Sequence, residues 1–271
     1  MGFYIFGIFI YYYGFFIAIG VSIAFLVGLY LCKKFDTNFY DFLIFSCSIA
    51  LFAIVGAKTT YILISYKNID FSKIIDFRYI SYLMRYGFVF YGGALFAIFG
   101  YFFIKKYLDI DKKILAISIT LVPLVHAFGR IGCFFTGCCY GIMYNSRIFS
   151  KIYKNSKFAP NNISLFPVQL VESFCNILIF FILLFYILNI CKRDKKLYVL
   201  EIYLSLYATV RFILEYFRGD LIRGKFLFFS TSQWISIFLI LFVIFRLTIE
   251  FNTIKKKMSW LYKFNFSYLY F

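Results

Sequence analysis

The sequence predicts an all-α integral membrane protein with about seven transmembrane helices. Of its 271 residues, 63% are hydrophobic, and a soluble domain of this size could not bury that much apolar surface. Residues 1–32 carry no charged side chain, and Phe226–Phe245 is a second uncharged run, 20 residues long. Apolar runs of about 18 residues or more are typical of helices that cross a bilayer. We therefore expect residues 1–271 to form a single polytopic membrane domain.

The first apolar run is expected to remain in the protein as its first span. A signal peptide begins with basic residues, whereas Lys33 and Lys34 follow this run. The pattern of apolar runs then predicts seven spans. Their approximate bounds are 8–32, 42–64, 87–104, 114–133, 170–190, 198–217 and 228–248.

The net charge of +17 is concentrated between the spans. Basic clusters follow the first, third, fifth and seventh spans, at residues 32–36, 105–113, 191–196 and 255–257. Cytoplasmic loops carry an excess of lysine and arginine, so this alternation predicts an N-terminus outside and a C-terminus in the cytoplasm. Attraction to anionic lipid accounts for the charge, and no nucleic acid is expected as a partner.

A few ionisable residues interrupt the predicted spans. Each costs about 2.5–3.5 kcal/mol on insertion scales, which makes them candidate functional residues. Lys58 lies within the second span, and Glu172 lies at the start of the fifth. Arg130 ends the fourth span and is the only charged residue between Ile114 and Ser146.

The sixth span carries a polar stripe. In a continuous helix, Tyr207, Arg211, Glu215 and Arg218 would fall within an arc of about 80°. One interpretation is an Arg211–Glu215 pair at the helix surface. The other is a cavity wall that binds an anion, because a guanidinium group presents a fixed fork of donors to phosphate. We favour the anion site.

His126 is the only histidine of the chain and lies four residues before Arg130, so the two side chains share a helix face. It is either a satisfied core residue or part of an active site. Glycines punctuate the segment that follows, and they predict that the helix ends there and continues as a loop. These glycines are Gly129, Gly132, Gly137 and Gly141.

Three of the seven cysteines, Cys133, Cys138 and Cys139, follow Arg130 closely. Their C-x4-C-C spacing lacks the paired framing of structural zinc sites, so no metal is expected. Structural thiols around a tight turn are the favoured interpretation. A thiol activated by Arg130 remains open, whereas a disulfide between adjacent cysteines would be strained.

Several short stretches between about residues 11 and 245 resemble, in order, the motifs of the prolipoprotein diacylglyceryl transferase family. No single stretch is specific, but the ordered series is. The stretches are YYYGFF (11–16), VGAKTTYIL (55–63), FVFYGGAL (88–95), GRIGCFFTGCCYG (129–141), FPVQLVE (166–172), YATVRFILEYFRGD (207–220) and STSQWIS (230–236).

This resemblance implies a multi-pass protein of the bacterial inner membrane that needs no cofactor. It implies transfer of the diacylglyceryl group from phosphatidylglycerol to the lipobox cysteine of a prolipoprotein signal peptide, with release of glycerol phosphate. The expected catalytic residues are Arg130, Arg211, His126 and Tyr91. The expected substrate-binding residues are Tyr13, Lys58, Gly92, Gly93, Gly129, Gly132, Gln169, Glu172, Tyr207, Glu215 and Arg218.

The chain departs from the family pattern at four positions. Tyr91 replaces a histidine, while Cys133, Thr136 and Cys138 replace two asparagines and a glutamate. His126 is an added group, which we expect to take over the handling of protons. The departures leave two alternatives open. One is a related phospholipid-dependent transferase with a different acceptor, and the other is a polytopic binding or transport protein for an anionic lipid or solute.

Overall fold

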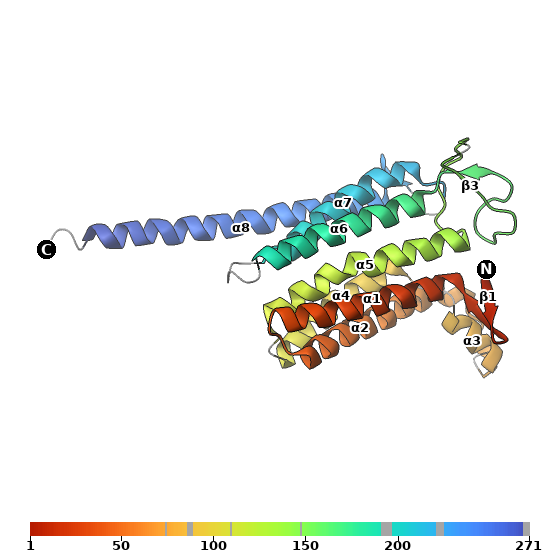
Figure 1. The fold of residues 1–271 in the computed structure, drawn as a ribbon, viewed down its shortest axis with the longest axis horizontal. Helices are drawn as coiled ribbons and strands as arrows, with labels where there is room; N and C mark the ends of the chain where they lie inside the picture. The colour runs from red at the N-terminus through yellow and green to blue at the C-terminus, as the bar shows by residue number, and fades with distance from the viewer. Residues whose placement is uncertain are drawn as a thin grey trace. The chain divides into compact units, whose positions relative to one another are not determined.

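A computed structural model describes residues 1–73, 75–85, 89–108, 110–146, 148–190, 197–220 and 225–267, and its regular structure is mostly helical (Figure 1). Seven long helices correspond to the seven predicted spans. They are α1 (Tyr12–Lys34), α2 (Phe39–Ser65), α4 (Phe90–Tyr107), α5 (Lys112–Thr136), α6 (Val168–Ile190), α7 (Val199–Leu214) and α8 (Thr231–Ser267).

Five of these helices are long and apolar enough to cross a membrane, and they confirm a helical membrane protein. They are α1, α2, α5, α6 and the Thr231–Thr253 part of α8. Helices α4 and α7 have 18 and 16 residues and are not among them. The count of seven spans therefore stays a prediction.

Some helix ends differ from the ends of the predicted spans. Helix α1 begins at Tyr12 and not at residue 8, because strands β1 (Gly2–Ile5) and β2 (Ile8–Tyr11) form an antiparallel hairpin before it. Helix α7 ends at Leu214 and not at residue 217, because the chain tightens into a 3-10 turn, η4 (Glu215–Phe217).

Contacts divide the chain into two compact units, and each is described by itself. The second unit comprises Gly28–Ser118 and holds η1 (Tyr66–Asn68), η2 (Phe71–Lys73) and α3 (Phe77–Arg85) besides α2 and α4. Helices α2 and α4 approach closely through glycine. A Cβ on Gly92 would lie 2.7 Å from the Gly56 carbonyl oxygen, which no side chain tolerates.

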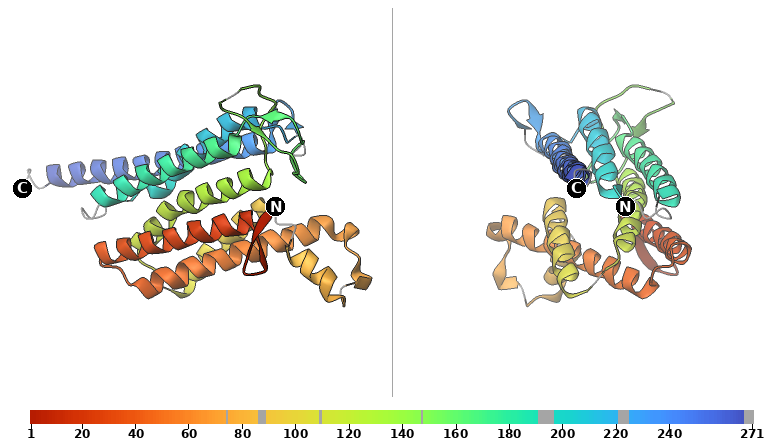
Figure 2. Two further views of the ribbon diagram at one scale, coloured as in Figure 1. Left: turned by 45° about the vertical axis from the view of Figure 1, so that its right-hand side comes forward. Right: turned by 90° about the vertical axis from the view of Figure 1, so that its left-hand side faces the viewer.

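The first unit comprises Met1–Val27 and Ile119–Phe271. Within it, α7 packs against both α6 and α8 (Figure 2). Two small antiparallel pairs flank these helices, β3 (Lys151–Ile152) with β4 (Ser164–Leu165), and β5 (Lys225–Phe226) with β6 (Phe229–Ser230).

The loop after α5 has its own small core, in which Tyr153, Ala159 and Leu165 are buried. This core anchors the loop to α5, because the Tyr153 hydroxyl donates to the Phe134 carbonyl at 2.8 Å. Inside α5, Pro123 has no N–H to donate to the Ile119 carbonyl one turn earlier.

Candidate active site

Arginines and carboxylates from three helices and the turn after α7 converge inside the first unit. The charged cluster, as we name it, consists of His126, Arg130, Glu172, Arg211, Glu215 and Arg218. His126 and Arg130 lie on α5, and Glu172 lies on α6. Arg211 lies on α7, and Glu215 and Arg218 lie in and just after its 3-10 turn.

Glu172 joins the members of the cluster that come from different segments. Its side chain is 1% exposed, and its Oε1 lies 2.9 Å from Arg130 Nη2 and 3.9 Å from His126 Nε2. Its Oε2 lies 3.9 Å from Arg218 Nη1. A buried carboxylate is stable only beside such partners, so Glu172 fixes the spacing between two arginines.

Glu215 plays the same part for the end of α7. Its Oε2 lies 2.6 Å from Arg211 Nη2 and 4.0 Å from Arg218 Nε. Arg211 Nη2 also donates to Ser232 Oγ on α8 at 3.0 Å. The side chains of Arg211, Glu215 and Arg218 therefore converge, although the α-helix ends before Glu215.

Arg218 is held by a two-pronged bond to Asp220. Its Nε and Nη2 donate to the two carboxylate oxygens at 2.9 and 2.8 Å. Burial alone would lower the pKa of Arg218, but the bond to Asp220 raises that pKa above its ordinary value. Arg218 therefore stays charged.

Two donors in the cluster are left over. Nη1 of Arg211 and Nη1 of Arg218 are buried and have no hydrogen-bond partner among the residues that the structure describes. A buried donor without an acceptor is costly, and native proteins seldom leave one. An oxyanion with several acceptor oxygens, such as a phosphate diester, would satisfy both.

His126 contacts Arg130 as the i, i+4 spacing predicts. Its Nε2 accepts a hydrogen bond from Arg130 Nε at 3.2 Å, and its ring lies 5.4 Å from the ring of Tyr207. The imidazole therefore belongs to the charged cluster and not to an apolar core. Its lone pair on Nε2 is engaged by the arginine in this state.

The three thiols that follow Arg130 lie together. The Sγ atoms of Cys133, Cys138 and Cys139 are all within 4.8 Å of one another, and the structure holds them as thiols. The neighbouring thiols of Cys133 and Cys138 lower the pKa of Cys139, against the effect of burial, and the charges of Arg130 and Arg218 lower it further. The thiol cluster therefore borders the charged cluster.

Two other predicted residues position this region. Gln169 is 1% exposed, and its Nε2 donates to the Cys138 carbonyl at 2.9 Å, which ties α6 to the thiol turn. Gly132 lets α1 approach α5, because a Cβ there would lie 3.0 Å from the Cα of Tyr13. A Cβ on Gly129 would meet only Ile17, at 3.9 Å, so packing does not require glycine there.

Three further predicted residues, Lys58, Gly92 and Gly93, belong to the second unit. Lys58 donates to the Leu83 carbonyl and lies 5.1 Å from the ring centroid of Tyr61. Gly92 and Gly93 serve the packing of α4 on α2. The side chain of Tyr91 lies outside the described part of the structure.

Sequence reasoning missed three polar partners of the cluster. Ser232 bonds Arg211 and Asp220 bonds Arg218. Both lie inside stretches that resemble family motifs, 230–236 and 207–220, although neither was named as a site residue. Asn176 was detectable. It lies one turn after Glu172 in an apolar helix, is fully buried, and leaves its Oδ1 without a partner among the described residues.

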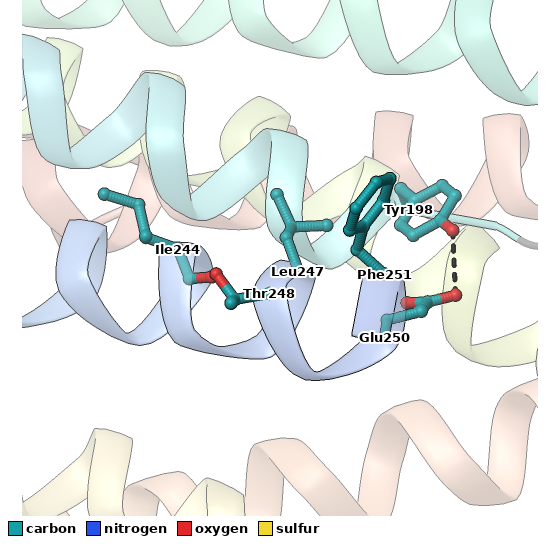
Figure 3. A pocket seen from close by; sticks show the side chains of 6 residues that line it. All are labelled: Tyr198, Ile244, Leu247, Thr248, Glu250 and Phe251. Carbon is teal, nitrogen blue, oxygen red and sulfur yellow. Dashed lines mark hydrogen bonds between the residues drawn. The ribbon is translucent and has the colours of Figure 1, made fainter. Parts of the chain in front are cut away.

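A groove of about 490 Å³ lies at the opposite end of α7, about 20 Å from Arg211 at 1.5 Å per residue (Figure 3). In it the Tyr198 hydroxyl donates to Glu250 Oε1 at 2.8 Å. Its lining includes a carboxylate and no cation, which does not suit an anion. It is lined by Tyr198, Ile244, Leu247, Thr248, Glu250 and Phe251.

Comparisons with known proteins agree with one another. The family model for prolipoprotein diacylglyceryl transferase matches residues 1–249. The chain is 38% identical over 249 residues to a phosphatidylglycerol–prolipoprotein diacylglyceryl transferase of Clostridium tetani, covering 91% of this chain and 95% of that one. A second enzyme of that name, from Clostridium perfringens, is 32% identical over 242 residues, with 88% and 90% covered. A third, from Wigglesworthia glossinidia brevipalpis, is 34% identical over 216 residues, with 70% and 74% covered.

Proposed function

The chain belongs to the prolipoprotein diacylglyceryl transferase family, and from that premise we propose the reaction that it catalyses. It transfers the diacylglyceryl group of phosphatidylglycerol to the lipobox cysteine thiol of a prolipoprotein. The acceptor sulfur attacks the glyceryl carbon that carries the phosphate ester. A C–S bond forms as the C–O bond breaks, and glycerol phosphate leaves with the bonding electrons.

This proposal rests on two guanidinium donors that have no hydrogen-bond partner among the described residues. The donor lipid has one anionic phosphate, and Nη1 of Arg211 and Nη1 of Arg218 are buried donors that such a group would satisfy. Charge grows on the phosphate as the C–O bond breaks, and donors that are already oriented stabilise it. Arg211 and Arg218 supply these donors, Arg130 adds its positive charge, and Glu172 and Glu215 position the three arginines.

His126 takes part in moving the acceptor proton. A free cysteine is mostly protonated at neutral pH, and histidine is the side chain whose ordinary pKa suits a base there. Its Nε2 lone pair is engaged by Arg130 here. When the arginine turns to a phosphate oxygen, that lone pair becomes able to accept a proton. Tyr91, whose side chain is not described, donates a hydrogen bond to the lipid headgroup.

The chain forms one polytopic domain that crosses the inner membrane seven times, with its N-terminus outside. Helix α4 has 18 residues, about 27 Å, and α7 with η4 runs from Val199 to Phe217, about 28 Å. Both come close to the ~30 Å hydrocarbon core. The basic clusters after alternate helices favour a cytoplasmic C-terminus.

Purified protein in vesicles of phosphatidylglycerol tests the reaction directly. A peptide with a lipobox cysteine is added, and both glycerol phosphate release and the mass of the peptide are measured. We expect both signals together, and neither with a peptide that carries serine in place of the cysteine. Release without a mass gain would indicate a different acceptor. Lipid binding without release would indicate a binding or transport protein.

A further inference from the structure

The three thiols beside Arg130 are arranged as ligands of one metal ion. Their sulfur atoms lie within 4.8 Å of one another. Tetrahedral zinc with Zn–S bonds of about 2.3 Å separates its sulfurs by about 3.8 Å, so small side-chain rotations would suffice. The C-x4-C-C spacing predicted structural thiols because it lacks the framing of a closed four-ligand site. An open site needs only three protein ligands.

The turn that carries the thiols is fixed by its own contacts. The Gly137 N–H donates to the Cys133 carbonyl at 2.8 Å, and Gly137 and Cys139 have φ angles of 79° and 56°. These positive φ values fold the chain back so that the thiols meet. Gln169 holds the Cys138 carbonyl from α6. Sulfurs on a constrained turn lose little entropy when they bind a metal.

The surroundings also suit thiolate ligands. Three thiolates on a divalent ion carry one net negative charge, which a buried site must offset. Arg130 can supply that charge, because it lies about one helical turn before Cys133 on α5. Cys133 follows Arg130 on α5, and the other two thiols lie beside Cys133. The thiols are therefore not a distant addition to the charged cluster.

We propose that Cys133, Cys138 and Cys139 bind a zinc ion, and that the acceptor thiol occupies its fourth coordination position. Three protein ligands and one open position are typical of catalytic zinc. A thiol that coordinates such an ion loses its proton outright, here to His126 or water. The bound thiolate then attacks the glyceryl carbon as described above, and zinc keeps its oxidation state. This inference rests on the proposed function.

Metal content tests the site first. We expect about one zinc ion per chain in protein purified with a reductant and supplied with zinc, and the same in Cys47→Ser, an exposed cysteine of α2. Cys133→Ser, Cys138→Ser and Cys139→Ser should each lose most of it. Because a variant can misfold, wild-type protein is also alkylated with and without zinc. Zinc should protect these three thiols and leave the extent of Cys47 alkylation unchanged. Absence of both zinc binding and protection would overturn the site.

Cobalt replacing zinc tests the fourth position, because sulfur-to-cobalt charge transfer reports the number of bound thiolates. The absorption should rise when the cysteine peptide is added and stay constant with the serine peptide. An unchanged spectrum would overturn the role of the acceptor as a ligand. Zinc-free enzyme should transfer about 30-fold more slowly at pH 7, because a thiol of pKa 8.5 is only a few per cent ionised there.

Two outcomes separate this inference from the proposed function. Full-rate transfer by zinc-free protein would overturn the role of zinc in the reaction and leave the transferase in place. Zinc and cobalt binding without any glycerol phosphate release would overturn the transferase and leave the metal site.

Discussion

The charged cluster and the α2–α4 pair differ in the partners that they provide for charged side chains in apolar helices. In the cluster, three helices and a turn bring arginines and glutamates to one place, and two guanidinium donors have no hydrogen-bond partner within the described part of the chain. In the α2–α4 pair, Lys58 donates to the Leu83 carbonyl, and glycines set the helix contact. A charge within a span therefore marks a site when several segments converge on it, and not merely because it is charged.

The sharpest test of this difference is the loss of a cluster arginine. We expect Arg130→Ala or Arg211→Ala to lower transfer by about 10³-fold or more, since a single lost donor already costs 10²–10³. Arg246→Ala is the matched control, because Arg246 pairs with Glu201 away from the cluster. Glycerol phosphate release and membrane insertion are measured together. Normal turnover by Arg211→Ala would contradict the proposal that Arg211 binds the lipid phosphate.

The second test separates two roles of His126. His126→Gln should lower transfer by about 10²–10⁴-fold, the range of a lost general base. The glutamine oxygen can still accept the Arg130 bond that Nε2 now accepts. If His126 only orients Arg130, His126→Gln should retain transfer and His126→Leu should lose it. The pH profiles of both variants decide the matter, and unchanged rate and pH dependence in His126→Gln would exclude the base.

The third test asks whether Gly92 is needed for helix packing or for substrate binding. Gly92→Ala should destabilise the protein by about 1–3 kcal/mol, because its Cβ would press on the Gly56 carbonyl. Gly14→Ala is the control, since nothing lies within 4 Å of a Cβ there. Thermal unfolding and transfer are compared at a temperature at which both variants are folded. Lost transfer with an unchanged Tm would return Gly92 to the substrate site.

The smallest effect is expected at Lys58. Lys58→Gln keeps a donor for the Leu83 carbonyl, so transfer should change by no more than about threefold, in line with a net hydrogen-bond contribution below about 1 kcal/mol. Initial rates at saturating and limiting lipid are compared. A loss as large as that of Arg130→Ala would show that Lys58 contacts the substrate.

The helices and the polar stripe could be predicted from the sequence for a physical reason. Long uncharged runs have few stable folds in a bilayer, and a 3.6-residue period places Arg211 and Glu215 on one face. The same period predicted that His126 and Arg130 share a helix face, and in the structure Arg130 Nε donates a hydrogen bond to His126 Nε2.

The rest depends on contacts between distant segments. Nothing local identifies Glu172 as the residue that joins arginines 130 and 218. The meeting of the thiols depends on the left-handed backbone at Gly137 and Cys139. A non-glycine residue rarely adopts that conformation, so a local pattern does not predict it. The hairpin before α1 was missed because its apolar strands, Gly2–Ile5 and Ile8–Tyr11, continue into the apolar helix.

Pro123 gives α5 a mechanical property. A helix with a missing backbone bond bends there at lower cost than an intact helix. His126 and Arg130 both lie within two turns beyond it, bonded to each other. If α5 bends at Pro123, the imidazole and the guanidinium move together, because the hydrogen bond between them lies wholly beyond the bend. Such a movement would change the distance from Arg130 to Glu172 on α6, so substrate binding and the charge pairing of the cluster would be coupled.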